Sequence, residues 1–272
     1  LITALENSEP ADIVMVSRDA AFEEGSSAYT KPGAKISMND LCYGLMLNSG
    51  NDAAVAIAEH ISGDVNKFVE LMNSTAKKIG ANDTSFKKPN GLHNDEHFTT
   101  ASDLAKITYY ALRNDEFCKI VSSRMYTSKM TLPDGSITEV EYINHNKLLK
   151  DMEGCIGVKT GFTKNAGRCL VSAMDCDGMR YIIVTLNDSD DWNTHKTLYE
   201  AVLLSDGTVL RISTSQESAW FLMIGMLWPV TLIAVLAIGL SAPLARRMAK
   251  NIVEPLNKLN LEQPLSNDTY EE

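Results

Sequence analysis

Two short groups of residues carry side chains that could do chemistry. The first group is Ser49, Gly50 and Asn51, and the second is Lys159, Thr160 and Gly161. Together they supply hydroxyl, amide and ammonium groups, which bind polar molecules and take part in proton transfer. Neither group is specific by itself, because Ser-Gly-Asn between helices is ordinarily an N-terminal cap and Lys-Thr-Gly ordinarily ends a strand. The order of the two groups and the residues around them must therefore decide between a structural and a chemical role.

The predicted elements around these groups suggest how they are positioned. The first group lies between predicted helices at residues 37–47 and 52–61, and the second ends a predicted strand at residues 156–160. Further helices are predicted at residues 65–79 and 99–113, and further strands at residues 168–174 and 181–186, with short strands around a turn at residues 133–135. The last three strands should form an antiparallel meander. The pattern is that of a mixed α/β (α+β) protein.

The composition excludes several classes of protein. A chain of 272 residues with 44% hydrophobic residues is long enough for one sizeable domain and an appendage. The net charge of −10 comes from interleaved charges without a basic block, so no nucleic-acid partner is expected. The five cysteines lack a C-x-x-C spacing, and the histidines lack the i, i+4 pairing of a helical metal site, except His93 and His97, which lie in a predicted loop. No metal and no cofactor are predicted.

Longer stretches around the two groups resemble a known family. Residues 47–54, 157–163, 86–92 and 144–149 are similar to segments of the serine D-alanyl-D-alanine carboxypeptidases, the low-molecular-mass penicillin-binding proteins. Their signature is Ser-x-x-Lys, then Ser-x-Asn, then Lys-Thr-Gly. The resemblance covers about residues 1–199. It implies the transpeptidase fold shared by penicillin-binding proteins and serine β-lactamases, and the removal of the terminal D-Ala from peptidoglycan stem peptides through an acyl-enzyme, with β-lactams as inhibitors.

The resemblance also implies a role for each residue of the two groups. Ser49 would relay a proton towards the leaving amine, and Asn51 would hold the amide of the substrate. Lys159 would supply positive charge near the substrate carboxylate and Ser49, and Thr160 would hydrogen-bond the same carboxylate. The strand that bears Lys159 should pair with the extended peptide substrate. Ser49, Asn51 and Lys159 are thus the expected catalytic residues, and Lys159, Thr160 and Gly161 the expected substrate-binding residues.

The first motif of the family has no counterpart ahead of Ser49. Two Ser-x-x-Lys matches, at residues 74–77 and 85–88, follow Ser49 instead of preceding it, and both are interpreted as surface residues. The apolar run at residues 1–5 has no helix start signal before it, so the chain is expected to begin within a helix. We therefore expect the chain to lack its acylating serine and the base beside it, and to be inactive as written.

Two other functions remain open. A serine β-lactamase would need a carboxylate-activated water for fast deacylation, and no loop between Ser49 and Lys159 is clearly built for it. A membrane-tethered module could instead bind peptidoglycan or a β-lactam without turnover and signal through its membrane helix.

The sequence changes character after about Tyr199. Residues 200–218 are interpreted as an extracytoplasmic linker. Residues 219–240 contain no charged residue and would form a helix about 33 Å long, enough to cross a bilayer. Lysine and arginine follow at once, so residues 241–272 are predicted to be cytoplasmic and the catalytic domain to be extracytoplasmic at the cell membrane. This tail resembles a sensor histidine kinase membrane segment, although no histidine follows His195. A natural fusion and an assembly artefact both remain possible origins.

Overall fold

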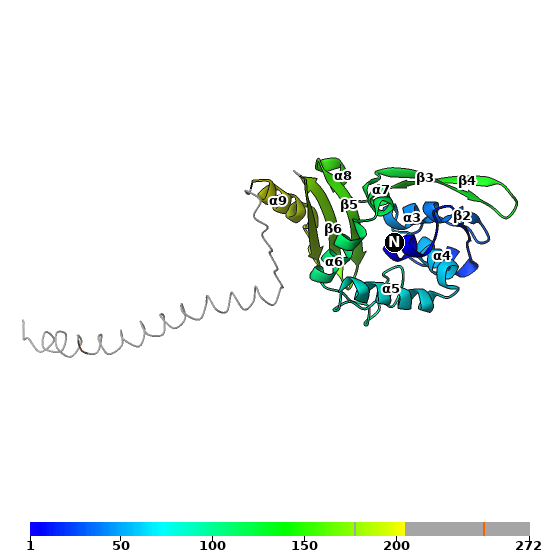
Figure 1. Ribbon diagram of the computed structural model, residues 1–272, viewed down its shortest axis with the longest axis horizontal. Helices are drawn as coiled ribbons and strands as arrows, with labels where there is room; N and C mark the ends of the chain where they lie inside the picture. Colours follow the sequence, from blue (N-terminus) through cyan, green and yellow to red (C-terminus); the bar gives the residue numbers. More distant parts are fainter. Residues whose placement is uncertain (177, 205–246, 248–272) are drawn as a thin grey trace, which may run out of the picture. The chain divides into compact units, whose positions relative to one another are not determined.

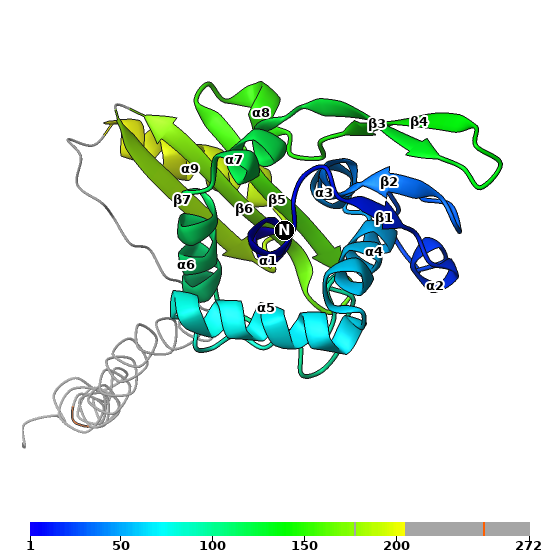
Figure 2. The same cartoon turned by 45° about the vertical axis from the view of Figure 1, so that its right-hand side comes forward.

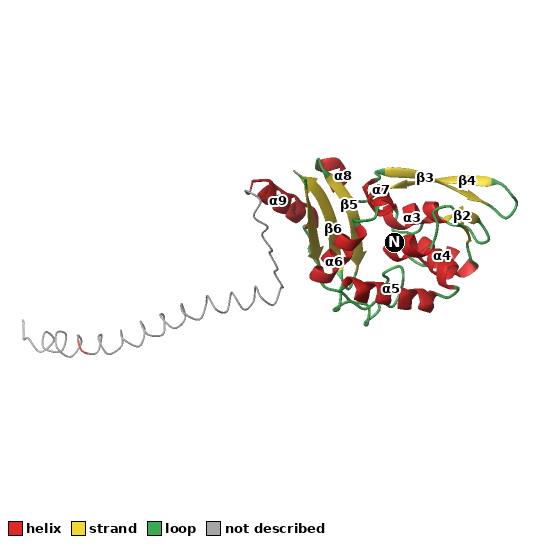
Figure 3. Ribbon diagram, in the orientation of Figure 1, coloured by secondary structure: helices red, strands yellow, loops and turns green. Residues whose placement is uncertain are grey.

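The computed structural model describes residues 1–176, 178–204 and 247. The helices are α1 (Ile2–Asn7), α2 (Arg18–Ala21), α3 (Met38–Leu47), α4 (Asn51–Ser62), α5 (Val65–Ile79), α6 (Ala101–Ala111), α7 (Asp115–Ser122), α8 (Leu148–Asp151) and α9 (Asp191–Leu204). The strands are β1 (Ile13–Met15), β2 (Lys35–Ser37), β3 (Met125–Thr131), β4 (Ile137–Ile143), β5 (Cys155–Thr163), β6 (Gly167–Cys176) and β7 (Met179–Leu186). Helices and strands thus share the described chain, and the mixed α/β prediction is confirmed (Figure 3).

The strands form two antiparallel sheets. One sheet has the order β1-β2-β3-β4, and β3 and β4 extend from it as a long hairpin (Figure 1). The other sheet has the order β5-β6-β7, which is the predicted meander. Helices α6 and α7 pack on one face of this sheet and α9 packs on the other (Figure 2). The second sheet is therefore covered on both faces, whereas the outer edge of β5 has no strand beside it among the described residues.

Local signals explain the predicted helices. Ser37, Asp64 and Thr100 each precede a helix, and each side chain accepts a hydrogen bond from the backbone N–H three residues later. Gly63 and Gly80 end α4 and α5 in the left-handed conformation, which glycine adopts without steric cost. The predictions for α3, α4, α5 and α6 are therefore confirmed, with the bounds of α5 correct at both ends.

Helix α4 lies at the centre of the helical part. Every residue from Asn51 to Ala58 is buried, and α2, α3, α5 and β1 all pack around the helix. Apolar residues on all sides are expected of a helix that is enclosed by other elements. The first turn of this helix begins at Asn51, so the core itself holds the first predicted group in place.

The structure also contains elements that the sequence pattern did not predict. These are α2, α7, α8, α9 and the three-residue strands β1 and β2. Strand β5 continues to Thr163 and not only to the predicted end at residue 160, so Gly161 lies within the strand. The predicted boundary at Tyr199 lies inside α9, where Tyr199 is fully buried. No helix within residues 1–176 and 178–204 is long and apolar enough to span a membrane. The predicted membrane helix, residues 219–240, lies outside the described residues.

A buried polar cluster joins α9 to the second sheet. Both ring nitrogens of His195 are hydrogen-bonded, Nδ1 to the Ser172 hydroxyl at 2.7 Å and Nε2 to the Thr185 hydroxyl at 3.0 Å. The Ser172 hydroxyl also bonds to the Tyr199 hydroxyl at 2.7 Å. A neutral imidazole fits this arrangement, because one nitrogen donates and the other accepts. Burial lowers the pKa of His195 to about 4, although Asp191 and Asp188 act in the opposite direction.

We predict that His195 makes the fold sensitive to acid. Between pH 6.5 and about 4 the unfolded chain binds a proton on this ring that the folded chain does not bind. The free energy of unfolding should therefore fall as pH falls through this window, by roughly 1 kcal/mol for each pH unit from this group. Urea unfolding of the wild type and His195→Gln at pH 7 and pH 5 measures the effect, and the variant should lose less stability between the two.

The exposed His60 on α4 provides the matched control. His60→Gln should keep the pH dependence of the wild type. An equal loss of stability between pH 7 and pH 5 in the wild type and His195→Gln would contradict the assignment.

Candidate active site

Ser49 lies in the tight connection between α3 and α4. Its φ of 57° is left-handed, a conformation that costs a residue with a Cβ roughly 1 kcal/mol. Gly50 follows because no side chain fits there: a Cβ would lie 2.7 Å from Ala28 Cβ and 2.8 Å from Ala28 N. From this turn the Ser49 hydroxyl accepts a hydrogen bond from the Lys159 ammonium of the second sheet.

Asn51 donates hydrogen bonds to the loop before β2, whereas its side-chain oxygen accepts none from the described residues. Its Nδ2 donates to the Glu24 carbonyl at 2.7 Å, and its backbone N–H donates to the Ser26 carbonyl at 2.8 Å. The residue is 8% exposed. Its Oδ1 has no hydrogen-bond partner within the described chain, so a fixed acceptor remains for the N–H of a bound molecule.

Lys159 comes from β5, 110 residues further along the chain. Its Nζ donates to the Ser49 hydroxyl and to the Thr160 carbonyl, the latter at 2.9 Å. A bulge at Gly157 brings β5 against α7, where a Cβ on Gly157 would lie 2.7 Å from the Val121 carbonyl oxygen. Burial lowers the pKa of the Lys159 ammonium to about 8. The structure thus brings the two predicted groups together.

The edge of β5 completes the site. Strand β5 pairs with β6 along one side, with Lys159 opposite Val171 and Gly161 opposite Cys169. Its other edge has no partner strand in the described chain, and such an edge can pair with an extended peptide. The Thr160 hydroxyl makes no hydrogen bond within residues 1–204, and Gly161 is exposed. The site therefore offers a strand edge, an ammonium group, an amide oxygen and two hydroxyls.

The family-model comparison matches residues 2–190 to the peptidase S11 family, described as D-alanyl-D-alanine carboxypeptidase. The chain belongs to this family. The carboxypeptidase DacF of Bacillus subtilis is 35% identical over 179 residues, which cover 66% of this chain and 45% of DacF. The carboxypeptidase of Streptomyces strain K15 is 36% identical over 164 residues, which cover 58% of this chain and 56% of that protein. The chain spans about half the length of these curated relatives.

Solved structures place the fold in the same group. The crystal structure of the Streptomyces K15 DD-transpeptidase superposes with a TM-score of 0.70 and 30% identity, over 74% of this chain and 84% of that one. The carboxypeptidase DacD of Francisella tularensis superposes with a TM-score of 0.68 and 30% identity, over 75% of this chain and 62% of that one. The S11 chain thus has the mixed α/β fold of the penicillin-binding DD-peptidases, as the motifs predicted.

Other candidates from the sequence lie elsewhere. Ser74 and Lys77 are exposed on α5, as predicted, and share no hydrogen bond. Ser85 and Lys88 are only half-buried on the stretch before α6, and they share none either. Neither pair has a hydrogen bond or ion pair with Ser49 or Lys159 in the described chain, so neither is assigned as the nucleophile of this site.

Two features of the site were missed by sequence reasoning. The loop before β2 supplies the Glu24 and Ser26 carbonyls that hold Asn51, and any residue type can supply a carbonyl, so no pattern revealed it. His145 lies near Lys159: burial, and then the charge of Lys159, lower the pKa of its ring. The similarity of residues 144–149 to family segments was the one available signal for His145.

We predict that the strain at Ser49 can be measured. Ser49→Gly and Ser49→Ala both remove the hydroxyl, but only glycine relieves the left-handed backbone. Ser49→Gly should therefore be about 1 kcal/mol more stable than Ser49→Ala in urea unfolding.

The same two substitutions at Ser74, in the middle of α5, provide the control. Glycine should there be less stable than alanine by about 1 kcal/mol, because it weakens a regular helix. Equal stability of the two Ser49 variants would show that the backbone at this position is unstrained.

Proposed function

We propose that this chain forms the substrate-holding part of a serine-type D-Ala-D-Ala carboxypeptidase, which removes the terminal D-Ala from peptidoglycan stem peptides. The contact of Lys159 with Ser49 beside the open edge of β5 is the observation that carries the proposal. The names of the S11 relatives support the reaction, and penicillin-type β-lactams would inhibit it as analogues of the same peptide.

Each residue receives a role from its position. The peptide would lie along β5 and place its terminal carboxylate against the Lys159 ammonium and the Thr160 hydroxyl, with its backbone beside Gly161. The Asn51 Oδ1 would accept a hydrogen bond from a substrate amide. A serine hydroxyl would attack the carbonyl carbon of the penultimate residue, the C–N bond would break, and Ser49 would pass a proton to the leaving D-Ala amine. Water would then cleave the acyl-enzyme ester.

The acylating serine is not assigned to any residue of this chain. No Ser-x-x-Lys precedes Ser49 in the 272 residues, and the two that follow have no hydrogen bond to Ser49 or Lys159 in the described chain. The proposal therefore gives this chain substrate binding and proton relay. It also includes an extracytoplasmic site tethered by residues 219–240, supported by their charge-free apolar run.

The function is tested with diacetyl-L-Lys-D-Ala-D-Ala as the substrate. Calorimetry should detect binding of this tripeptide by the 272-residue chain, and weaker binding of the L-Ala-L-Ala analogue. Release of D-Ala should be measured with the product of the complete reading frame that encodes this chain. Absence of binding and of D-Ala release in both preparations would refute the proposal.

We predict that substrate affinity depends on pH through Lys159. The ammonium is charged below its pKa of about 8 and neutral above it. Tripeptide affinity should thus be constant below pH 8 and fall above it, by up to about tenfold for each pH unit. In Lys159→Ala, affinity should be low at every pH. Calorimetry between pH 6 and pH 10 measures both curves.

Lys164 provides a matched control, because it is an exposed lysine in the turn directly after β5. Lys164→Ala should reproduce the wild-type affinity and its pH dependence. A wild-type affinity that stays constant up to pH 10 would show that the Lys159 ammonium does not bind the substrate carboxylate.

A further inference from the structure

One buried carboxylate beside the site has no place in the proposed reaction. Asp52 directly follows Asn51 and is fully buried. Its Oδ1 accepts hydrogen bonds from the backbone N–H groups of Ala28 at 2.7 Å and Ala53 at 2.9 Å. Its Oδ2 accepts from the Ser27 hydroxyl at 2.7 Å, and from the Thr30 N–H and hydroxyl at 3.0 Å each. Four of these five donors belong to one segment, residues 27–30: the Ser27 hydroxyl, the Ala28 N–H, and the N–H and hydroxyl of Thr30.

This segment fits tightly against the turn that carries the site. Ala28 is fully buried between Gly44 and Gly50, and a Cβ on either glycine would lie 2.7 Å from Ala28 Cβ. Its carbonyl accepts a hydrogen bond from the Tyr142 hydroxyl at 3.0 Å. Ala28 is therefore fixed through its N–H, its carbonyl and its side chain at once.

The residues just before this segment hold Asn51. The Glu24 carbonyl accepts from Asn51 Nδ2, and the Ser26 carbonyl accepts from the Asn51 N–H. Gly25 between them has a φ of 91°, and a Cβ there would lie 2.7 Å from Asn51 Nδ2. The position of this loop thus sets the plane of the Asn51 amide and the direction of its unpaired Oδ1.

We propose that Asp52 is a positioning residue: its carboxylate fixes the loop at residues 24–30, and the loop in turn aims the Asn51 Oδ1 and the Ser49 turn at the substrate. The positioning of the loop by Asp52 can be tested in the protein without substrate. Its effect on substrate binding rests on the proposed function. A carboxylate suits this position because both of its oxygens accept hydrogen bonds. The NH2 group of an asparagine is a donor and would face another donor, the N–H of either Ala28 or Thr30.

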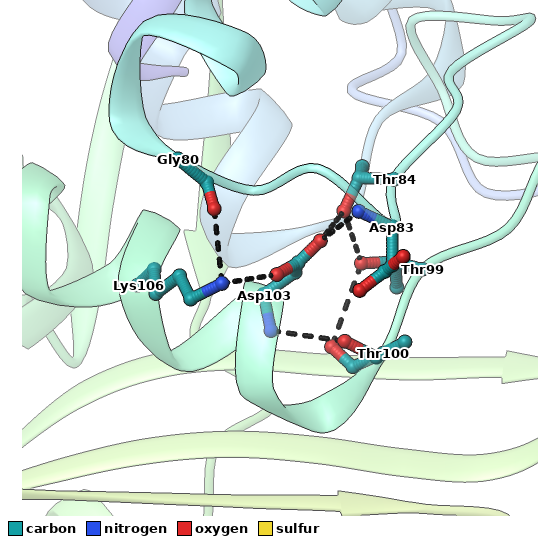
Figure 4. A network of polar contacts seen from close by, with 7 residues as sticks. All are labelled: Gly80, Asp83, Thr84, Thr99, Thr100, Asp103 and Lys106. Atoms are coloured by element: carbon teal, nitrogen blue, oxygen red, sulfur yellow. Dashed lines mark hydrogen bonds and ion pairs between the residues drawn. The ribbon is translucent and has the colours of Figure 1, made fainter.

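Asp103 is a matched control, since it is equally buried and binds a loop in the same way (Figure 4). Its carboxylate accepts from the Asp83 N–H at 2.7 Å, the Thr84 hydroxyl at 3.0 Å and the Lys106 ammonium at 2.8 Å. This network joins the start of α6 to the stretch after α5 (Figure 4), and none of its hydrogen bonds in the described chain involves Ser49 or Asn51.

The test compares Asp52→Ala and the milder Asp52→Asn with Asp103→Ala and Asp103→Asn. Hydrogen exchange by NMR reports the Asn51 backbone amide, and calorimetry reports affinity for diacetyl-L-Lys-D-Ala-D-Ala. In the Asp52 variants the Asn51 backbone amide should exchange at least about tenfold faster, because the loss of one hydrogen bond changes an equilibrium by about this factor. Affinity should fall by up to about 100-fold in Asp52→Ala, because a misplaced binding group loses its contact. The Asp103 variants should change neither quantity more than about twofold at temperatures where they remain folded.

Unchanged exchange at Asn51 in both Asp52 variants would overturn the inference, and so would an equal acceleration in the Asp103 variants, which would indicate general destabilisation. If exchange accelerates only in the Asp52 variants but the wild type does not bind the tripeptide, the positioning role holds and the proposed function fails. Loss of affinity without any change in exchange at Asn51 would assign Asp52 to the substrate directly and refute the positioning role.

Discussion

The hydrogen bond from the Lys159 ammonium to the Ser49 hydroxyl is the contact on which the rest of the site depends. It joins the end of one helix to the edge of a sheet across 110 residues of chain. An ammonium group that leaves water needs acceptors, and the Ser49 hydroxyl and the Thr160 carbonyl provide them. The strained turn at Ser49, the bulge at Gly157 and the buried helix α4 can all be understood as ways to place these two groups at one point.

Much of this arrangement could be predicted from the sequence. Helix α5 has an aspartate cap, an apolar stripe and a terminal glycine, so its bounds were predictable. The meander of β5, β6 and β7 follows from apolar runs broken by turn residues. The motif containing Lys159 was recognisable because its neighbours matched a family, and not because of its own three residues. These signals are local, so they can be recognised in the sequence without knowledge of the fold.

The parts that could not be predicted depend on contacts between distant segments. Helix α9 packs partly through His195 and Tyr199, whose polar groups interrupt the apolar periodicity that marks a helix. Strands β1 and β2 have three residues each, too few for an alternating pattern. Helix α7 is an exception, because its signal is local: an Asn114 cap followed by the apolar residues Phe117 and Ile120. The loop that holds Asn51 works through backbone carbonyls, which leave no trace in residue type.

The close packing of Ala28 between Gly44 and Gly50 limits which substitutions these positions can accept during evolution. Neither glycine can gain a carbon atom alone, because a Cβ at either position would lie 2.7 Å from Ala28 Cβ, and a Cβ at position 50 would also lie 2.8 Å from the Ala28 backbone nitrogen. Glycine at position 28 would remove the closest contact of a Cβ at position 44 but not the backbone contact at position 50, so positions 28 and 44 should vary together across relatives while position 50 stays glycine. Recombination between distant homologues with a crossover between residues 28 and 44 would separate matched partners. Chimeras of this kind should therefore be depleted among natural sequences, even where both parents fold well.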